Sequence, residues 1–389
     1  MKLYTTPLRL AEKLIALPSY VDEQQDETQA LEWLATFLEA TFPEMKVQKQ
    51  YLNDSRRYNL LLKGKRQPKL LVLGHLDTVQ PKQGWGTDPF KPVVKNGKLY
   101  GLGAADMKSS LATFLWALAE EKADLALDEL AILIYIDEEY DFQGIKRFLA
   151  EDLTPLTPQM TLSLDGSLAV ATGCRGLIEL SLTIKGRSGH ASNPANGVNA
   201  ITRTVAALEE VANKLTTFVD VDLGPTTTNL AALQGGTVQK APDGTLRWLE
   251  AGNVIPDTVR AVFEVRPSTP AVNARMVVQM AKQLLQQQGL TLAEATIRHD
   301  IRPWPVNYDP TSLDRLKRVY AQACVPLRIA DRKLQGYIDA QMVAETIAAP
   351  TFIIGTGGNN KHGANENVPL KNLERATAIY RALLREVLA

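Results

Sequence analysis

Five side chains of the types that bind metal ions occur in segments far apart in the sequence. Each lies in a loop next to an apolar run or a helical stretch, and they are His75, Asp106, Glu139, Asp165 and His362. A single loop histidine or carboxylate is most often a solvated surface residue. In open α/β sheets, however, ligands gather beyond the carboxyl ends of the strands. We therefore interpret the five side chains as one site at one edge of one sheet.

The residue types indicate which ions this site would hold. Two imidazoles and three carboxylates without cysteine suit Zn, Co or Mn, whereas structural zinc sites favour cysteine. Two such ions can share a carboxylate and lower the pKa of a water molecule to about 7. Because Glu138 stands beside Glu139, one glutamate can bind metal while the other acts as general base toward the water. The residues thus predict a two-metal hydrolase.

A nucleotide site is the competing interpretation of the loop around Asp106. Gly101-x-Gly103-x-x-Asp106 approximates a dinucleotide-binding loop, but an acid replaces the third glycine. A carboxylate there would repel a pyrophosphate at the helix N-terminus. We reject the nucleotide interpretation.

The segments that must position these residues alternate between strand and helix patterns. Apolar runs at 69–74, 130–136 and 160–164 predict buried strands, and helices are expected at 107–122 and 141–151. This alternation predicts an α/β domain with a mainly parallel sheet and helices on both faces.

The middle of the chain follows a different pattern. Strands expected at 177–185, 259–266 and 291–298 alternate polar and apolar residues, and amphipathic helices are expected at 198–215 and 271–288. Alternating strands are typical of a sheet with one open face, so we expect a smaller α+β domain here.

A strand at 351–355 and a helix at 370–388 then resume the first pattern. The simplest architecture is a catalytic domain made of residues 1–174 and 303–389, interrupted by an inserted domain at 175–302.

Composition excludes several function classes. The 389 residues contain 43 Lys+Arg and 43 Asp+Glu, so the chain has no overall field that would hold nucleic acid or an anionic membrane. No stretch approaches the roughly 18 apolar residues of a membrane span. Thr6 followed by Pro7 is typical of the start of an amphipathic helix, and we expect such a helix here rather than a signal peptide. With two cysteines and no disulfide framework, we expect a reduced, cytoplasmic protein.

Six segments resemble, in family order, the M20 metallopeptidases and deacylases, which include acetylornithine deacetylase, succinyl-diaminopimelate desuccinylase and carboxypeptidase-type relatives. They are Gly74–Val79, Tyr100–Lys108, Asp137–Glu139, Gly186–Ser192, Asn253–Pro256 and His362–Asn367. The resemblance spans nearly the whole chain. It implies a catalytic domain like that of the zinc exopeptidases and an inserted domain that forms a homodimer.

The resemblance also implies a role for each ligand. Asp106 would bridge two metal ions, His75 and Asp165 would complete one site, and Glu139 and His362 would complete the other.

The catalytic roles come from the same resemblance. Glu138 would be the general base and would pass the proton to the leaving amine. Asp77 would accept a hydrogen bond from His75 and fix its tautomer. His190, in the inserted domain, would reach the partner's active site and steady the tetrahedral oxyanion.

Three further residues would contact the substrate. Asn253 and Arg266 match substrate-contacting positions, and Arg266 would pair with a carboxylate as a bidentate fork. Gly357 belongs to a Gly355-Thr-Gly357 turn whose backbone N–H groups would bind a substrate carboxylate. Alternatively, Asn253 is a turn cap and Arg266 a surface cation. His299 has no matching motif, and we expect it at the surface.

The sequence departs from the family pattern at two positions. Ser109 replaces a glycine, which would alter only loop packing. Asp165 stands where deacetylases and carboxypeptidases of the family mostly have Glu, whereas aminopeptidases and dipeptidases mostly have Asp.

The leading hypothesis is a homodimeric hydrolase of an N-acyl amino acid. The alternative is a dipeptidase, aminopeptidase or carboxypeptidase that cleaves short peptides, and a remote one is a non-catalytic binding protein.

Overall fold

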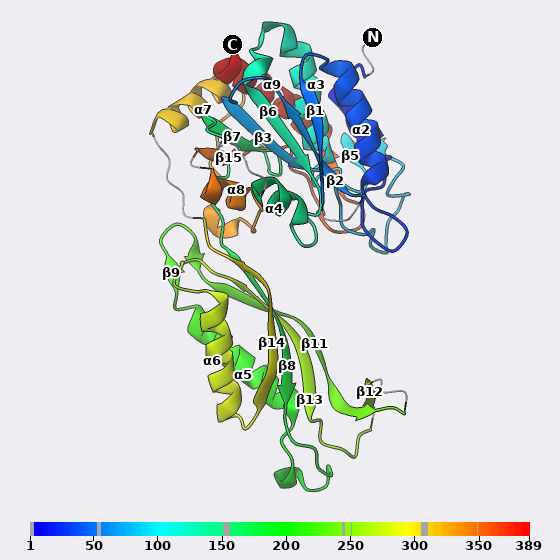
Figure 1. Cartoon of the computed structure of the whole chain (residues 1–389), viewed down its shortest axis with the longest axis vertical. Coiled ribbons are helices and arrows are strands. Elements are labelled where there is room, and N and C mark those ends of the chain that lie inside the picture. The colour runs from blue at the N-terminus through cyan, green and yellow to red at the C-terminus, as the bar shows by residue number, and fades with distance from the viewer. Residues whose placement is uncertain are drawn as a thin grey trace. The chain divides into compact units, whose positions relative to one another are not determined.

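The chain folds into two compact units, drawn in Figure 1. The computed structural model describes residues 4–52, 56–150, 156–242, 246–249, 251–304, 310–347 and 349–389. Unit 1 comprises Met1–Thr172, Val306–Asp331 and Ile338–Ala389, and unit 2 comprises Gly173–Pro305 and Arg332–Tyr337. The predicted boundaries include the short segment Arg332–Tyr337 in the catalytic domain, whereas in the structure it belongs to unit 2. There Arg175 Nη2 donates a hydrogen bond to the backbone oxygen of Lys333.

Unit 1 is built on a six-stranded sheet in the order β1–β2–β6–β3–β7–β15. The strands are β1 (Lys46–Tyr51), β2 (Tyr58–Lys63), β3 (Leu70–His75), β6 (Leu130–Tyr135), β7 (Met160–Ser163) and β15 (Thr351–Ile353). The last four in sheet order are parallel, whereas β1 and β2 pair antiparallel at one edge. Every residue of β3 and β6 is buried, as expected for apolar strands in the middle of a covered sheet. The predicted α/β fold class is confirmed.

The helices of unit 1 bury their apolar residues against the sheet and against one another. They are α1 (Pro7–Ile15), α2 (Thr28–Thr41), α3 (Lys108–Glu121), α4 (Gln143–Ala150), α7 (Pro310–Gln322), α8 (Ala340–Thr346) and α9 (Leu370–Leu388). Helix α3 packs against α1 and α9, where Phe114 meets Tyr380 edge to face. As expected, Thr6 caps α1 by accepting from the N–H of Arg9 at 3.2 Å. The helix expected at 141–151 is α4, and Glu151 lies outside the described residues.

A small three-stranded sheet in unit 1 joins two of the predicted site loops. It contains β4 (Val93–Lys95), β5 (Lys98–Tyr100) and β16 (Asn367–Pro369), with β5 in the centre. Because β5 precedes the Asp106 loop and β16 follows the His362 loop, their pairing brings both loops together.

Unit 2 is an antiparallel sheet with two helices packed on it (Figure 1). The strand order is β12–β11–β13–β8–β14. Its elements are β8 (Leu177–Lys185), α5 (Ala200–Leu215), β11 (Thr227–Lys240), β12 (Leu246–Leu249), β13 (Thr258–Arg266), α6 (Ala274–Gln287) and β14 (Thr291–Ile301), with the short pair β9 (Val219–Asp220) and β10 (Gly224–Pro225). The sequence pattern had predicted three of these five sheet strands. It missed β11 and β12 because β11 is rich in polar residues and glycine.

His299 was expected at the surface, and that expectation was wrong. It lies in β14 with 8% of its surface exposed. The register of β14 against β8 shifts between Ile297 and His299, which breaks the simple alternation of faces along the strand.

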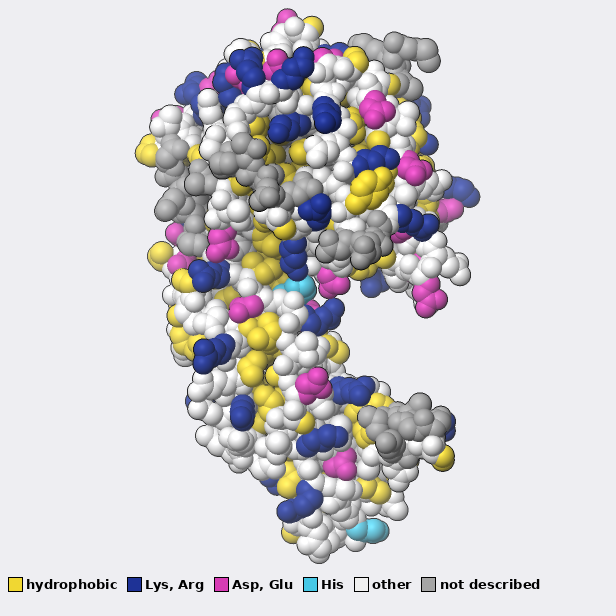
Figure 2. Space-filling view, in the orientation of Figure 1, with side chains coloured by type: hydrophobic (Ala, Val, Ile, Leu, Met, Phe, Trp, Pro, Cys, Tyr) yellow, Lys and Arg dark blue, Asp and Glu magenta, His cyan; other side chains and the backbone are white. Residues whose placement is uncertain are grey.

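The surface of the chain is mixed in charge. Figure 2 shows Lys and Arg side chains interspersed with Asp and Glu over the visible face. None of the helices that the structure describes combines the length and the apolar character of a membrane-spanning segment.

The fold itself generates one prediction, at a buried carboxylate between α3 and α9. Glu121 is 3% exposed and accepts hydrogen bonds from Arg381 and Arg385. Burial raises its pKa, but the hydrogen bonds from Arg385 and Arg381 outweigh burial and lower the pKa below 4.5. Its stabilisation is therefore fully present above the unfolded-state pKa and is lost as pH falls through the folded-state value.

We expect Glu121→Gln to lower the melting temperature at pH 7 by about 2–4 °C, equivalent to about 1 kcal/mol. The gap should narrow at pH 3, because the stabilisation by Glu121 is lost as the pH falls through its lowered folded-state pKa. Thermal melts in chelator at both pH values measure this, and Glu39→Gln, an exposed glutamate of α2, is the control. A gap that persists unchanged at pH 3 would contradict the ion-pair explanation.

Candidate metal centre

The five predicted ligands lie in two overlapping groups within unit 1. One group is His75, Asp106 and Asp165, and the other is Asp106, Glu139 and His362. In each group the possible ligand atoms all lie within 4.8 Å of one another. Asp106 belongs to both groups, as a bridging carboxylate would.

The parallel strands explain why these residues meet. Strand β3 ends at His75, β6 leads into Glu139, and β7 leads into Asp165. Strand β15 leads through a loop to His362. Because these four strands are neighbours and parallel, their carboxyl ends open onto the same edge of the sheet.

The two oxygens of Asp106 face the two imidazoles. His75 Nε2 lies 3.3 Å from Oδ1, and His362 Nε2 lies 3.4 Å from Oδ2. His362 Nε2 is also 3.0 Å from Glu139 Oε2. Each imidazole therefore has its Nε2 directed at carboxylate oxygens.

Asp77 orients the site by a different route from the predicted one. The backbone oxygen of Asp77 lies 3.1 Å from His75 Nδ1, whereas its carboxylate Oδ1 is 3.6 Å away, beyond hydrogen-bonding distance. Its Oδ2 instead accepts the backbone N–H of Glu139 at 2.9 Å. The backbone thus directs the imidazole, and the carboxylate directs the glutamate loop.

Glu366 holds the Asp106 loop, a role that the sequence analysis missed. Its Oε1 accepts the N–H groups of Ala105 at 2.6 Å and Asp106 at 2.9 Å, and its Oε2 accepts that of Gly103 at 3.0 Å. The side chain is 1% exposed, and burial raises the pKa of Glu366 to about 7. The available signal was its position within the motif that begins at His362.

Arg57, which immediately precedes β2, forms ion pairs that brace the segment carrying the two glutamates. Arg57 Nη2 lies 2.6 Å from both Glu27 Oε1 and Asp137 Oδ1. Asp137 has a left-handed backbone conformation with φ 69°, and its Oδ2 accepts the N–H groups of Asp141 and Gln143 at the start of α4. Spacing alone gave no signal for Arg57 because its partners lie 30 and 80 residues away.

Lys361 is a second residue that the sequence analysis missed. Its Nζ lies 3.1 Å from Asp165 Oδ1 and 3.3 Å from Asp106 Oδ2. Burial alone would lower the pKa of Lys361, but the charges of Asp165 and Asp106 raise it above the usual value. The ammonium is therefore protonated and pairs with two predicted ligands.

Carboxylates crowd the site and disfavour one another's ionisation. Burial raises the pKa of Glu138, Glu139 and Asp165, and neighbouring carboxylates raise these pKa values further. Hydrogen bonds to Asp106 and Glu139 raise the pKa of His362 to about 10. Divalent cations would relieve this repulsion.

The donor set fits two divalent ions. Both groups combine an imidazole Nε2 with carboxylate oxygens, the combination that Zn, Co and Mn accept. Contact of His75 Nδ1 with a backbone oxygen leaves Nε2 available as the ligand atom. His75, Asp106 and Asp165 would hold one ion, and Asp106, Glu139 and His362 the other.

The other predicted residues lie elsewhere. His190 and Asn253 are exposed residues of unit 2 in neighbouring segments, joined by the hydrogen bond from Ala191 N to Asn253 O at 2.9 Å. Arg266 forms a bidentate pair with Glu264, at 2.9 and 3.0 Å.

The turn Gly355-Thr-Gly357 is in unit 1, and its N–H groups are already engaged. Gly355 donates to Ser167 O, Thr356 to Ser110 Oγ, and Gly357 to Gly166 O at 2.8 Å. The Gly357 N–H is already engaged by the backbone oxygen of Gly166, in the loop that follows Asp165. The structure therefore contradicts the predicted binding of a substrate carboxylate by this N–H group.

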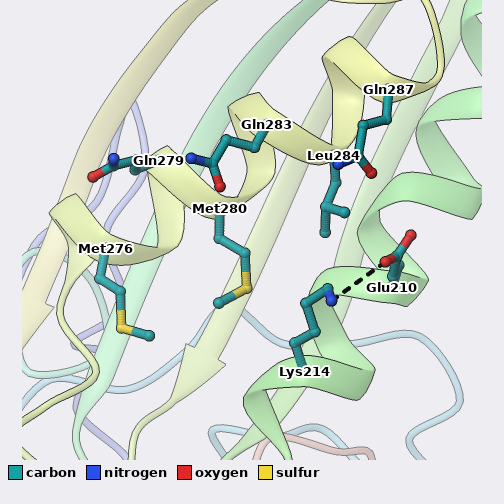
Figure 3. Close-up of a pocket in the computed structure, with 8 residues that line it drawn as sticks. All are labelled: Glu210, Lys214, Met276, Gln279, Met280, Gln283, Leu284 and Gln287. Carbon is teal, nitrogen blue, oxygen red and sulfur yellow. Dashed lines mark ion pairs between the residues drawn. The ribbon is translucent and has the colours of Figure 1, made fainter.

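A separate hollow of about 340 Å³ lies between α5 and α6 in unit 2 (Figure 3). Figure 3 shows Leu284 and Gln287 of α6 pointing toward the ion pair of Lys214 with Glu210. Its lining contains one carboxylate and no histidine, so it has no metal-binding donor set.

A mainly parallel α/β sheet with overlapping histidine and carboxylate groups beyond its strand ends defines a metal-dependent hydrolase. A model of peptidase family M20/M25/M40 matches residues 71–386. The chain is 30% identical over 406 residues to succinyl-diaminopimelate desuccinylase from Halorhodospira halophila (strain DSM 244 / SL1), a match that covers 98% of each chain. This chain belongs to peptidase family M20/M25/M40.

Two solved structures have the same fold as this chain. A tripeptidase from Staphylococcus aureus subsp. aureus Mu50 superposes with a TM-score of 0.75 at 22% identity, covering 98% of this chain and 97% of that one. A dinuclear metal-binding M20 peptidase from Bacillus subtilis gives a TM-score of 0.65 at 15% identity, covering 98% and 97%.

The Asp106 loop generates a prediction about metal binding. Glu366→Gln replaces one acceptor oxygen with an amide donor that would face backbone N–H groups, so the loop should shift. We expect metal affinity to fall about 10–100-fold while the circular dichroism spectrum is retained. Metal titration measures this, with the exposed Glu374→Gln as control. Unchanged affinity in Glu366→Gln would show that the loop does not depend on Glu366.

Proposed function

We propose that this protein is a two-metal hydrolase that cleaves the amide bond of an N-acyl amino acid. The observation that carries the proposal is the sharing of Asp106 between two histidine and carboxylate groups, whose His75 and Glu139 act electrostatically on Glu138. A single structural ion would need one group, whereas two groups that share a carboxylate suit two ions acting on one substrate.

The chain's own residues would move the proton. When bound, two divalent ions would polarise the scissile carbonyl and lower the pKa of water. Glu138 would accept a proton as water attacks the carbonyl carbon, and would deliver it to the amine nitrogen as the C–N bond breaks. Burial raises the pKa of Glu138, with the charges of Asp339 and Glu139 acting in the same direction, which suits a group that must both take up and release a proton.

The substrate class rests on similarity and on charge. The curated relative at 30% identity is named succinyl-diaminopimelate desuccinylase. In unit 2, Arg266 lies opposite Thr227 in the sheet, and Arg175 donates to Thr227 Oγ1 at 2.8 Å. Two guanidinium groups at one end of the sheet favour an anionic substrate, such as an N-succinyl amino acid.

A peptidase activity is the second candidate. The tripeptidase from Staphylococcus aureus has the same fold, and Asp165 is the residue type that the family's aminopeptidases and dipeptidases mostly carry. The free carboxylate of a short peptide could form ion pairs with the same two arginines, Arg175 and Arg266.

Further features remain proposals that rest on the family resemblance and the composition. We propose a cytoplasmic homodimer in which unit 2 forms the interface and His190 steadies the oxyanion in the partner's site. Asn253 and Arg266 would contact the substrate, with Arg266 exchanging Glu264 for a substrate carboxylate. Zn is the first choice of metal, with Co and Mn as alternatives.

The function predicts metal-dependent turnover. Protein reconstituted with Zn or Co should hydrolyse at least one of N-succinyl-diaminopimelate, N-acetylornithine, other N-acetyl amino acids or dipeptides. Release of a free amine is the measurement. Exhaustive chelation should abolish activity, and addition of Zn or Co should restore it. Full activity after verified metal removal would overturn the proposed function.

The assignment of the base predicts a separation of binding from chemistry. Glu138→Ala should retain both ions, because Glu138 belongs to neither ligand group, and should lose about 10²–10⁴-fold in kcat. Glu139→Ala, the comparison variant, should lose one ion per chain. Elemental analysis together with steady-state kinetics tests both. Near wild-type kcat in Glu138→Ala would mean that another group is the base.

A further inference from the structure

Lys361 is placed inside the metal centre by the same loop that carries His362. The loop is closed at its base by hydrogen bonds between Asn359 and Asn367, from N to O at 2.8 Å and in return at 3.1 Å. Asn360 and His362, on either side of Lys361, both have left-handed backbone conformations with φ 59°. The loop therefore has a defined shape that turns both Lys361 and His362 toward the acidic residues.

The ammonium occupies oxygens that the ions would use. Lys361 Nζ lies 3.1 Å from Asp165 Oδ1, which belongs to the first ligand group, and 3.3 Å from Asp106 Oδ2. An ammonium has three donors and no lone pair, so it cannot itself bind a metal ion. Lys361 is thus a competitor for these carboxylates and not a sixth ligand.

Charge makes this competition substantial. A divalent ion held by Asp106 and Asp165 would lie within a few ångströms of the ammonium, where like charges repel strongly even at high effective dielectric. The ammonium pairs with two carboxylates of the first group, Asp106 and Asp165, but with one carboxylate of the second group, Asp106. The side chain of Lys361 is 40% exposed, so its flexible stem gives the ammonium a path toward solvent.

We propose that Lys361 is a built-in cation that substitutes for one of the two metal ions. It pairs with Asp165 and Asp106 when the centre holds fewer than two ions, and it weakens the site of His75, Asp106 and Asp165 relative to that of Asp106, Glu139 and His362. The two ions therefore bind in order, the second only as Lys361 leaves its carboxylates. The inference rests on the proposed two-metal centre but not on its catalytic activity.

Metal titration tests the proposal directly. Chelator-treated full-length protein is titrated with Co²⁺ alone, and bound ions are counted by equilibrium dialysis and elemental analysis. The wild type should show one tight and one weak ion per chain. Lys361→Met should tighten the weak ion at least about tenfold, because the competing charge is removed. Lys361→Gln serves as a second neutral variant, and Lys361→Arg, which keeps the charge, should keep the weak ion weak.

Thermal melts give a second readout that is independent of activity. In chelator, Lys361→Met should melt below the wild type, because its carboxylates have lost their cation. Saturating Co²⁺ should raise its melting temperature more than that of the wild type. Lys95→Met, at an exposed position of β4, is the matched control and should change neither the titration nor the melts.

Specific outcomes would overturn the proposal. These are equal affinity for both ions in the wild type, or weak-ion affinity that is unchanged or lower in Lys361→Met and Lys361→Gln. Unchanged affinity with a raised KM in Lys361→Met would make Lys361 a substrate contact instead. Tighter metal binding in a protein that hydrolyses none of the substrates would uphold the inference while the proposed function failed.

Discussion

Repulsion among carboxylates crowded at one edge of the sheet is the interaction on which the rest of unit 1 depends. Burial and mutual repulsion raise the pKa of Glu138, Glu139 and Asp165. Such a cluster is stable only when cations lie among its members. The chain itself contributes Lys361 and the imidazolium form of His362, and divalent ions would contribute the remainder.

Because the cluster would otherwise spread apart, its loops are fixed by groups outside it. Glu366 gathers three N–H groups of the Asp106 loop, and Asp77 holds the N–H of Glu139. Arg57 ties Asp137, next to the glutamate pair, to Glu27. Each of these contacts joins segments far apart in the sequence. Donor atoms can therefore keep ligand spacing without relying on the ions alone.

The two units divide the predicted tasks between them. All five predicted metal ligands and Glu138 belong to unit 1, whereas His190, Asn253 and Arg266 belong to unit 2. The predicted ligands are thus positioned by a sheet whose central strands β3 and β6 are fully buried. Of the predicted substrate contacts in unit 2, Arg266 ends strand β13 of the antiparallel sheet, whereas His190 and Asn253 lie outside its strands.

The sequence by itself determined the ligand types and their order after apolar strands, and hence the fold class. Apolar runs, whose composition predicts buried strands, precede His75, Glu139 and Asp165. The meeting of these three residues at one edge of the sheet was therefore predictable. The tertiary structure alone decided which groups support them. The contact of Glu366 with Gly103 spans 263 residues of sequence, and that of Lys361 with Asp165 spans 196. Arg57 acts through a buried ion pair with Asp137. No periodic pattern in the local sequence predicts such contacts. The predictions that the Gly357 N–H binds substrate and that His299 lies at the surface were wrong for the same reason. Whether an N–H is already engaged, or which way a shifted strand turns a side chain, depends on neighbours that only the folded chain supplies.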